Sequence, residues 1–288
     1  MKARLLDLLA FILARLPLRP ASALCWALAW LWWTVVPVRR DVARDNIARA
    51  LPELDPGSRP ATLRRSFHDI ALGYVELLRF LRDPRAGAAM VRSEGLEPLQ
   101  RLQREGRPAL VLQGHFGAWD LVLLAHGRGR GVRLACVVKP PADPWSAALV
   151  ERARRLCDIE LIPPRGSMER VYTALEAGRI VIFAMDQRFN EGIAAPFLGR
   201  PALTATGLAA AARRTGAPVF PAWQWREGPG RHVLRADAAL DLTWTDDAEA
   251  DIARTTARFN EILGERIRAR PHGWLWLHRR WRESGGPL

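Results

Sequence analysis

A histidine and an aspartate separated by four residues follow a short apolar segment of the chain. The segment Gln113-Gly114-His115-Phe116-Gly117-Ala118-Trp119-Asp120 comes directly after the run PALVL. Residues five apart do not share one face of a helix, but a strand, glycine turn and helix in succession can fold Asp120 back toward the His115 ring. The carboxylate would then hold one ring nitrogen and leave the other as a general base. The alternative, which the spacing alone favours, is a helix-capping aspartate beside an ordinary histidine.

The surrounding pattern indicates the elements that position this pair. Short apolar runs alternate with helical periodicity, which predicts a largely parallel, mixed sheet covered by helices on both faces. We expect strands at 108–113, 132–138, 159–162, 179–185, 218–225 and 232–236, and helices at 61–81, 118–126, 144–157, 167–177, 203–214 and 246–268. Sites in such sheets form at the carboxyl ends of strands. Polar residues directly after a strand are therefore the best candidates for chemistry.

Three further segments join the histidine motif in one resemblance. They are PPRGS at 163–167, MDQR at 185–188 with PFLGRP and TATG after it, and the closing WLWLHRRW at 274–281. Together with GHFGAWD, these segments resemble the bacterial lipid A late (lauroyl and myristoyl) acyltransferases, a branch of the His-x4-Asp/Glu glycerolipid acyltransferases. The resemblance covers residues 39–282 and implies a glycerolipid acyltransferase-like α/β fold.

The resemblance implies an enzyme that moves a fatty acyl chain from an acyl-carrier-protein or acyl-CoA thioester to a lipid hydroxyl. His115 would remove the hydroxyl proton and Asp120 would support the imidazolium that forms. Neither a covalent acyl-enzyme, a cofactor nor a metal is expected. A lipid A precursor is the expected acceptor; a lysophospholipid or an aminolipid hydroxyl is the alternative.

The other segments are expected to bind substrate. By resemblance, Arg165 belongs to a phosphate-binding block, and a helix N-terminus beside an arginine suits a phosphate. Asp186 and Gln187 would hydrogen-bond the acceptor headgroup or brace the His115 loop, and Arg188 would hold an anion. Arg279 and Arg280 are expected anion-binding residues. The alternatives are an ordinary surface arginine at 165, a turn-capping Asp186, and an amphipathic C-terminal helix.

The N-terminus predicts a membrane-associating segment over residues 1–40, followed by a single α/β domain over 41–288. An amphipathic helical pattern precedes the uncharged run ASALCWALAWLWWTVVPV at 21–38. As a helix this run would extend about 27 Å, marginal for crossing a bilayer, so spanning and interfacial anchors both remain open. Buried core helices and a cleaved signal peptide are lesser alternatives, since Asp7 and Arg15 interrupt the first apolar stretch.

Charge and aromatic content indicate the same surroundings. The formal net charge is +13, and the chain has twelve tryptophans against two tyrosines. Positive charge attracts anionic lipid, an acidic carrier protein or nucleic acid, whereas tryptophan favours bilayer interfaces. The absence of any helix-turn-helix, zinc-finger or RNP pattern argues against nucleic acid. We therefore expect the cytoplasmic face of a bacterial inner membrane. A noncatalytic lipid- or nucleic-acid-binding protein, or a hydrolase, are the competing functions.

Overall fold

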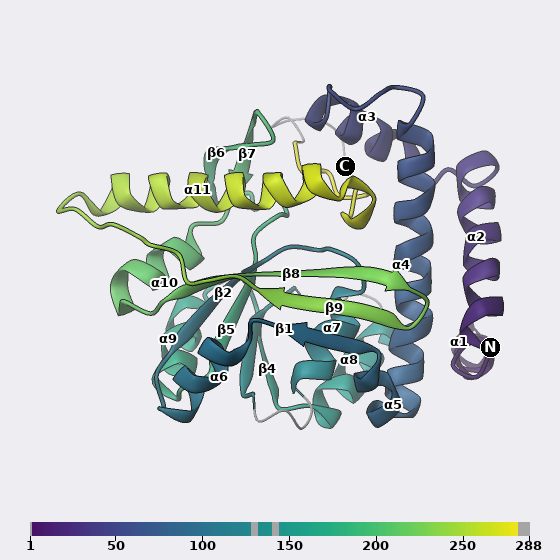
Figure 1. The fold of residues 1–288 in the computed structure, drawn as a ribbon, viewed down its shortest axis with the longest axis horizontal. Helices are drawn as coiled ribbons and strands as arrows, with labels where there is room; N and C mark the ends of the chain where they lie inside the picture. The colour runs from purple at the N-terminus through teal and green to yellow at the C-terminus, as the bar shows by residue number, and fades with distance from the viewer. Residues whose placement is uncertain (1, 128–131, 140–143, 282–288) are drawn as a thin grey trace.

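The computed structural model describes residues 2–127, 132–139 and 144–281, and its centre is a seven-stranded mixed sheet (Figure 1). The strand order is β1-β9-β8-β2-β5-β3-β4. Strands β8, β2, β5, β3 and β4 run parallel to one another, while β9 is antiparallel to β8 and parallel to β1. The strands are β1 (Val91–Glu94), β2 (Ala109–Gln113), β3 (Leu134–Val137), β4 (Ile159–Ile162), β5 (Ile180–Ala184), β8 (Val219–Gly228) and β9 (Arg231–Ala236). The predicted α/β fold with a largely parallel sheet is confirmed.

Helices cover both faces of this sheet, and a separate two-stranded hairpin lies beside one of these helices. The hairpin pairs β6 (Ile193–Phe197) with β7 (Arg200–Thr204). Within the described residues the helices are α1 (Lys2–Leu13), α2 (Leu18–Thr34), α3 (Arg40–Ala50), α4 (Arg59–Arg82), α5 (Pro84–Ala89), α6 (Glu97–Arg104), α7 (Trp119–Gly127), α8 (Pro144–Leu156), α9 (Met168–Glu176), α10 (Gly207–Thr215) and α11 (Ala248–Ala269), with the 3₁₀ turn η1 (Pro271–Gly273).

The central strands divide the core into two halves because successive side chains point to opposite faces. On β2, Leu110 and Leu112 pack into a cluster that includes residues of α9, α10 and α11. Ala109 and Val111 face a second cluster that includes residues of α6, α7 and α8. Burial on both faces explains why the parallel strands appear in the sequence as continuous apolar runs.

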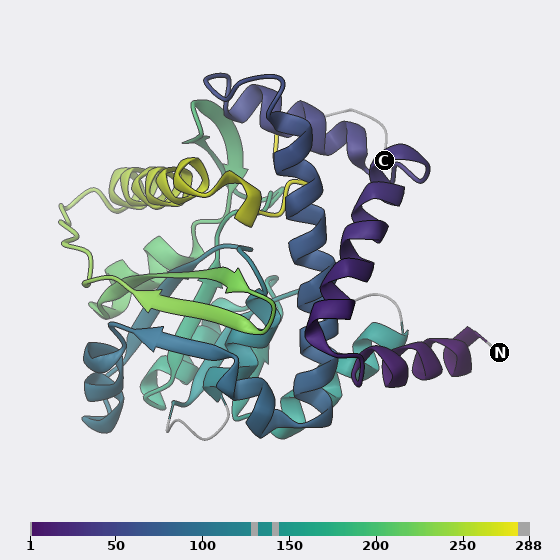
Figure 2. The same cartoon turned by 45° about the vertical axis from the view of Figure 1, so that its right-hand side comes forward.

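The N-terminal helices form an outer layer against α4 (Figure 2). Helix α2 packs on α4 through a small cluster that includes Cys25 and Leu72. The other side of this layer leaves large apolar side chains exposed; they include Leu5, Leu8, Phe11, Trp30 and Val35. Among the described residues, no helix combines the length and the apolar character needed to cross a membrane.

One predicted helix is partly wrong. The expected helix at 203–214 begins only at Gly207, because Leu203 and Thr204 end the second strand of the β6–β7 hairpin. The hairpin returns through Leu198, at φ 50°, and Gly199, at φ 76°. Its strands are short and partly exposed, so they lack the continuous apolar run that marked the central strands.

Candidate active site

His115 lies just past the carboxyl end of β2, where the chain turns toward α7. Strand β2 pairs in parallel with β5, and Gln113 is aligned with Ala184 at the last step of the register. His115 lies two residues beyond Gln113, and Asp186 lies two residues beyond Ala184. The sheet therefore places these two residues side by side, although 71 positions separate them in the sequence.

The Asp186 carboxylate holds His115 at two points. Its Oδ1 accepts a hydrogen bond from the His115 ring Nδ1 at 2.7 Å. Its Oδ2 accepts from the His115 backbone N–H at 2.8 Å and from the Trp274 indole Nε1 at 2.7 Å. Asp186 is itself only 1% exposed. The position and orientation of the His115 ring are thus defined by a buried, fully engaged carboxylate.

This bonding selects the ring nitrogen that is free for chemistry. A proton on Nδ1 that is donated to Asp186 leaves the lone pair on Nε2, the arrangement of a general base. The His115 side chain is 19% exposed, so the ring remains reachable. The Gln187 amide nitrogen lies 3.3 Å from Nε2, and the Trp119 ring contacts the imidazole edge-on at 5.2 Å between centroids.

The charges of the pair shift both pKa values. Burial by itself lowers the pKa of His115, but the Asp186 charge and hydrogen bond, with a further contribution from the Asp120 charge, raise it above its ordinary value. Burial by itself raises the pKa of Asp186, but the charge and hydrogen bonds of His115 and the Trp274 hydrogen bond lower it to about 2. Asp186 is therefore an anion at neutral pH and stabilises the imidazolium.

Asp120 lies elsewhere than the sequence predicted. Within the described residues no hydrogen bond joins its carboxylate to the His115 ring, and Asp186 occupies the expected place. The reason is helical geometry: consecutive residues of a helix point about 100° apart, and Trp119 already faces the imidazole. Asp120 instead lines a recess between α4 and α7 beside Tyr74. Burial raises its pKa, and the charge of His115 partly offsets that rise.

The predicted anion-binding arginines differ in exposure and in their partners. Arg165 is exposed and pairs with Glu191 at 3.2 Å, which ties its loop to the loop that follows Asp186. Arg188 is partly buried and donates to the Asn190 side chain at 2.8 Å. Arg279 is exposed on the C-terminal segment.

Arg280 departs from the expectation of a substrate contact. Its side chain is fully buried and donates to the Leu203 carbonyl at 2.6 Å and to the Thr204 hydroxyl at 2.7 Å. The guanidinium lies over the Phe197 ring at 4.6 Å. Arg280 thus anchors the C-terminal segment to the β6–β7 hairpin, because its donors are turned inward.

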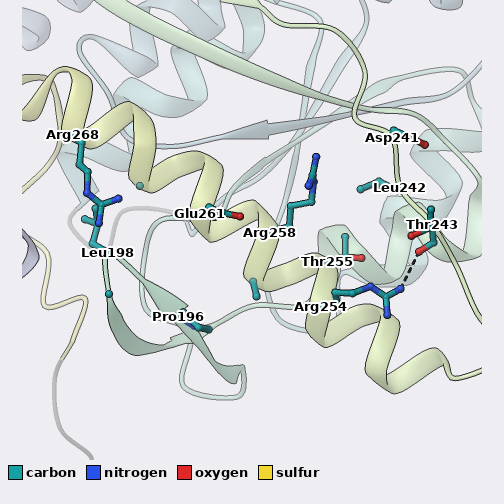
Figure 3. Close-up of a pocket in the computed structure, with 13 residues that line it drawn as sticks. Pro196, Leu198, Asp241, Leu242, Thr243, Arg254, Thr255, Arg258, Glu261 and Arg268 are labelled. Carbon is teal, nitrogen blue, oxygen red and sulfur yellow. Dashed lines mark hydrogen bonds between the residues drawn. The ribbon is translucent and has the colours of Figure 1, made fainter.

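A cavity of about 630 Å³ lies apart from this site, between α11, the hairpin and residues 241–243 (Figure 3). None of the thirteen residues drawn in it is a predicted site residue. Its arginines are largely matched by nearby acids: Arg254 pairs with Asp251, and Arg268 with Glu53. The cavity therefore adds nothing to the chemistry of His115.

The sequence did not predict the roles of two tryptophans at this site. Trp274 donates a hydrogen bond to Asp186, and the Trp119 ring contacts the His115 imidazole edge-on. Both belong to segments that the resemblance already marked, GHFGAWD and WLWLHRRW. An indole N–H is a polar group that must find a partner when buried, and that requirement was the available clue for Trp274.

Comparison with known proteins identifies the family. The family model described as bacterial lipid A biosynthesis acyltransferase matches residues 5–283. The chain is 24% identical over 253 residues to the Escherichia coli lipid A biosynthesis palmitoleoyltransferase, which covers 85% of this chain and 79% of that protein. The same identity and coverage relate it to the E. coli lipid A biosynthesis lauroyltransferase and to a lipid A biosynthesis acyltransferase of Shigella flexneri. The chain, in which His115 and a buried Asp186 meet at the carboxyl edge of the sheet, belongs to the family of bacterial lipid A biosynthesis acyltransferases.

Proposed function

We propose that this acyltransferase moves a fatty acyl chain from a thioester, on acyl carrier protein or CoA, to a hydroxyl of a lipid A precursor. The observation that carries the proposal is the His115–Asp186 pair: with Nδ1 bonded to Asp186, the Nε2 lone pair of His115 can accept a proton at the edge of the sheet where α/β enzymes bind substrate. The family match supports the acceptor class.

The reaction follows from this arrangement. Nε2 of His115 removes the proton of the acceptor hydroxyl while its oxygen attacks the thioester carbonyl carbon. The C–S bond of the resulting tetrahedral species then breaks, and the thiolate takes the proton back from the imidazolium. An ester and a free thiol result, with no acyl group on the protein at any stage. Asp186 stabilises the imidazolium between the two proton transfers.

Neighbouring groups have supporting roles in this proposal. The Gln187 amide lies within reach of Nε2 and is suited to hold the acceptor or the carbonyl oxygen. Asp120 adds negative charge that favours the imidazolium without touching the ring. Arg188, Arg165 and Arg279 supply cations for phosphate groups of the acceptor or donor.

The test of this function is a transfer assay with the full chain in membranes. Labelled acyl carrier protein and acyl-CoA donors are offered with a lipid A precursor, a lysophospholipid and a hydroxylated aminolipid side by side. We expect transfer to the lipid A precursor and its loss in His115→Ala. Transfer to another of these lipids alone would identify that lipid, and not the lipid A precursor, as the acceptor. Release of free fatty acid at the transfer rate would show that the protein is a hydrolase. No chemistry with any acceptor would leave a binding protein.

We propose that the protein acts on the cytoplasmic side of the inner membrane; the exposed apolar side of α1 and α2 supports contact with a membrane surface. Trp30 is 60% exposed and Leu5 is 67% exposed on this side, and exposed apolar patches of this kind mark interaction surfaces. Such helices bind by lying in the interface, helped by positive charge.

A vesicle assay tests the membrane arm separately from the chemistry. The full chain is sedimented with vesicles that contain anionic phospholipid. We expect Trp30→Asp to reduce the bound fraction, whereas Ala194→Asp, which places the same charge on the exposed face of β6, leaves it unchanged. Equal binding by both variants would refute membrane contact through α2.

A further inference from the structure

Gln224 lies on β8 behind the loop that carries His115, and it belongs to no segment that marked the family. Its side chain is buried, with only 3% exposure. The side-chain amide donates to the Phe116 carbonyl at 3.0 Å and to the Gly114 carbonyl at 3.3 Å. One amide group therefore bonds the carbonyls on both sides of His115.

The strand register explains why this turn takes a side-chain donor. The parallel pairing of β2 with β8 stops at Leu112 opposite Pro221, and proline has no backbone N–H that could continue the ladder. Among the described residues, β8 therefore offers no backbone pairing to the chain from Gly114 onward. The Gly114 carbonyl accepts from the Phe116 N–H at 2.9 Å as well as from Gln224. Buried carbonyls without a donor are costly, and Gln224 supplies a hydrogen bond to the Phe116 carbonyl and a second one to Gly114.

Gln224 is itself held in place. Its Oε1 accepts a hydrogen bond from the Gln113 side-chain amide at 2.7 Å. This contact fixes which end of the Gln224 amide faces the loop, because the oxygen is turned to Gln113 and both N–H groups to the carbonyls. The two glutamines form a rigid bracket between the end of β2 and the middle of β8.

The bracket completes the set of contacts that define the His115 backbone. Asp186 accepts from the His115 N–H, and the His115 carbonyl accepts from the Leu275 N–H at 3.2 Å. Gly117, at φ 53°, donates to the Gly273 carbonyl at 2.9 Å. These bonds come from β5 and from the C-terminal segment. The bonds of Gln224 come from the opposite neighbour in the sheet, so the loop is held from both sides.

We propose that Gln224 is a positioning residue for the transfer reaction: its amide holds the carbonyls of Gly114 and Phe116 and thereby keeps the His115 N–H and ring aimed at Asp186. It does not touch substrate and acts through His115 alone. The kinetic consequence rests on the acyl-transfer function proposed above, whereas the structural consequence for the imidazole does not.

The test replaces Gln224 with methionine, which keeps the length of the side chain and removes both donors. The His115 ring of the purified full chain is titrated by NMR with labelled histidine, and its signal is assigned by its loss in His115→Ala. We expect the titration of His115 to shift to lower pH, because a loosened loop weakens the contact with Asp186. In the transfer assay we expect kcat to fall about 100-fold, as for a misplacement of about 1 Å, with KM unchanged.

Two further variants separate positioning from a general loss of stability. Gln103 lies on α6, and its side-chain amide donates to the Arg133 carbonyl at 3.0 Å. Gln103→Met removes this hydrogen bond and should leave the His115 titration and kcat unchanged. Gln113→Met keeps both Gln224 donors and removes only their anchor, so a smaller shift in the same direction is expected. It also keeps the proposal testable if Gln224→Met does not fold.

The proposal is overturned if folded Gln224→Met, or Gln113→Met in its place, titrates like the wild type. It is also overturned if Gln103→Met shifts the His115 titration equally. A wild-type protein that transfers acyl groups to no acceptor would defeat the proposed function instead, and the NMR titration would still decide the role of Gln224.

Discussion

At the scale of single residues, the imidazole of His115 and the carboxylate that holds it come from the loops that follow two neighbouring strands. His115 and Asp186 meet because β2 and β5 are adjacent and in register. Asp186 was expected either to contact the acceptor or to brace the His115 loop, and its hydrogen bonds correspond to bracing. Asp120 contributes charge, and its part in catalysis stays a prediction. The two carboxylates therefore differ in a way that substitutions can separate.

We expect Asp186→Asn to lower transfer by about 10⁴-fold, the scale seen when a triad carboxylate becomes an amide and the tautomer is lost. Asp120→Asn should cost far less and should lower the pKa of His115 by less, because only Asp186 adds a hydrogen bond to its charge. Single-turnover rates and histidine NMR of both variants measure this. A larger loss in Asp120→Asn would reverse the roles assigned to the two carboxylates.

The raised pKa of His115 also sets the pH dependence. A general base must be neutral, so kcat/KM should rise with pH through a His115 pKa that is raised from its ordinary value. The effect on stability has the opposite sign: the charged imidazole stabilises the fold below the unfolded pKa, and this is lost as pH rises through the folded value. A pH–rate profile that levels off below the ordinary histidine pKa would contradict the pairing with Asp186.

At the scale of elements, the sequence predicted the central strands well and the site only in part. Strands such as β2 and β5 are buried on both faces and are visible as apolar runs. The β6–β7 hairpin has no such run. The His115–Asp186 contact depends on which strands are neighbours, and that order is a long-range property. Spacing alone favoured a helix-capping role for Asp120, and the family resemblance assigned it to His115; neither carries information on the sheet order that brings Asp186 to the ring.

The C-terminal segment gives a second element-scale prediction, with a matched control. Trp274 and Trp276 are equally buried, but Trp274 donates to Asp186 whereas Trp276 donates to the Pro271 carbonyl. We expect Trp274→Phe to reduce kcat about tenfold, since a hydrogen bond to a charged group contributes about 1.5 kcal/mol or more. Trp276→Phe should lower the melting temperature without that loss of rate. Equal rates in the two variants would show that the indole N–H of Trp274 is not needed.

At the scale of the whole molecule, a buried network of polar side chains joins the outer helical layer to the sheet. Glu76 of α4 is fully buried and bonds the Arg226 guanidinium, the Gly230 N–H at 2.8 Å and His232 Nε2 at 3.0 Å. Arg226 also bonds the Asp69 carbonyl at 3.1 Å. The network extends through His68, whose ring forms hydrogen bonds with the Asp69 carboxylate at 3.1 Å and with the Ser22 hydroxyl of α2 at 3.1 Å. Ion pairs and neutral hydrogen bonds therefore connect α2, α4 and the β8–β9 hairpin.

Removing the charge of Glu76 should be costly because the buried Arg226 cation would keep only the Asp69 carboxylate, at 3.4 Å, of the two carboxylates it pairs with in the described structure. We expect Glu76→Gln to lower the free energy of unfolding by about 3 kcal/mol, which corresponds to about 5 °C in melting temperature for a chain of this length. Asp45→Asn, in the half-exposed Asp45–Arg49 pair, should cost less than about 0.5 kcal/mol.

Burial by itself raises the pKa of Glu76, but His232 and Arg226 lower it below its ordinary value. The stability it supplies is therefore present above the unfolded pKa and is lost as pH falls through the folded value. Thermal melts from neutral pH downward should show the difference in melting temperature between wild type and Glu76→Gln becoming smaller in acid. A difference that stays constant would mean that the hydrogen bonds of Glu76, and not its charge, stabilise the contact between the layers.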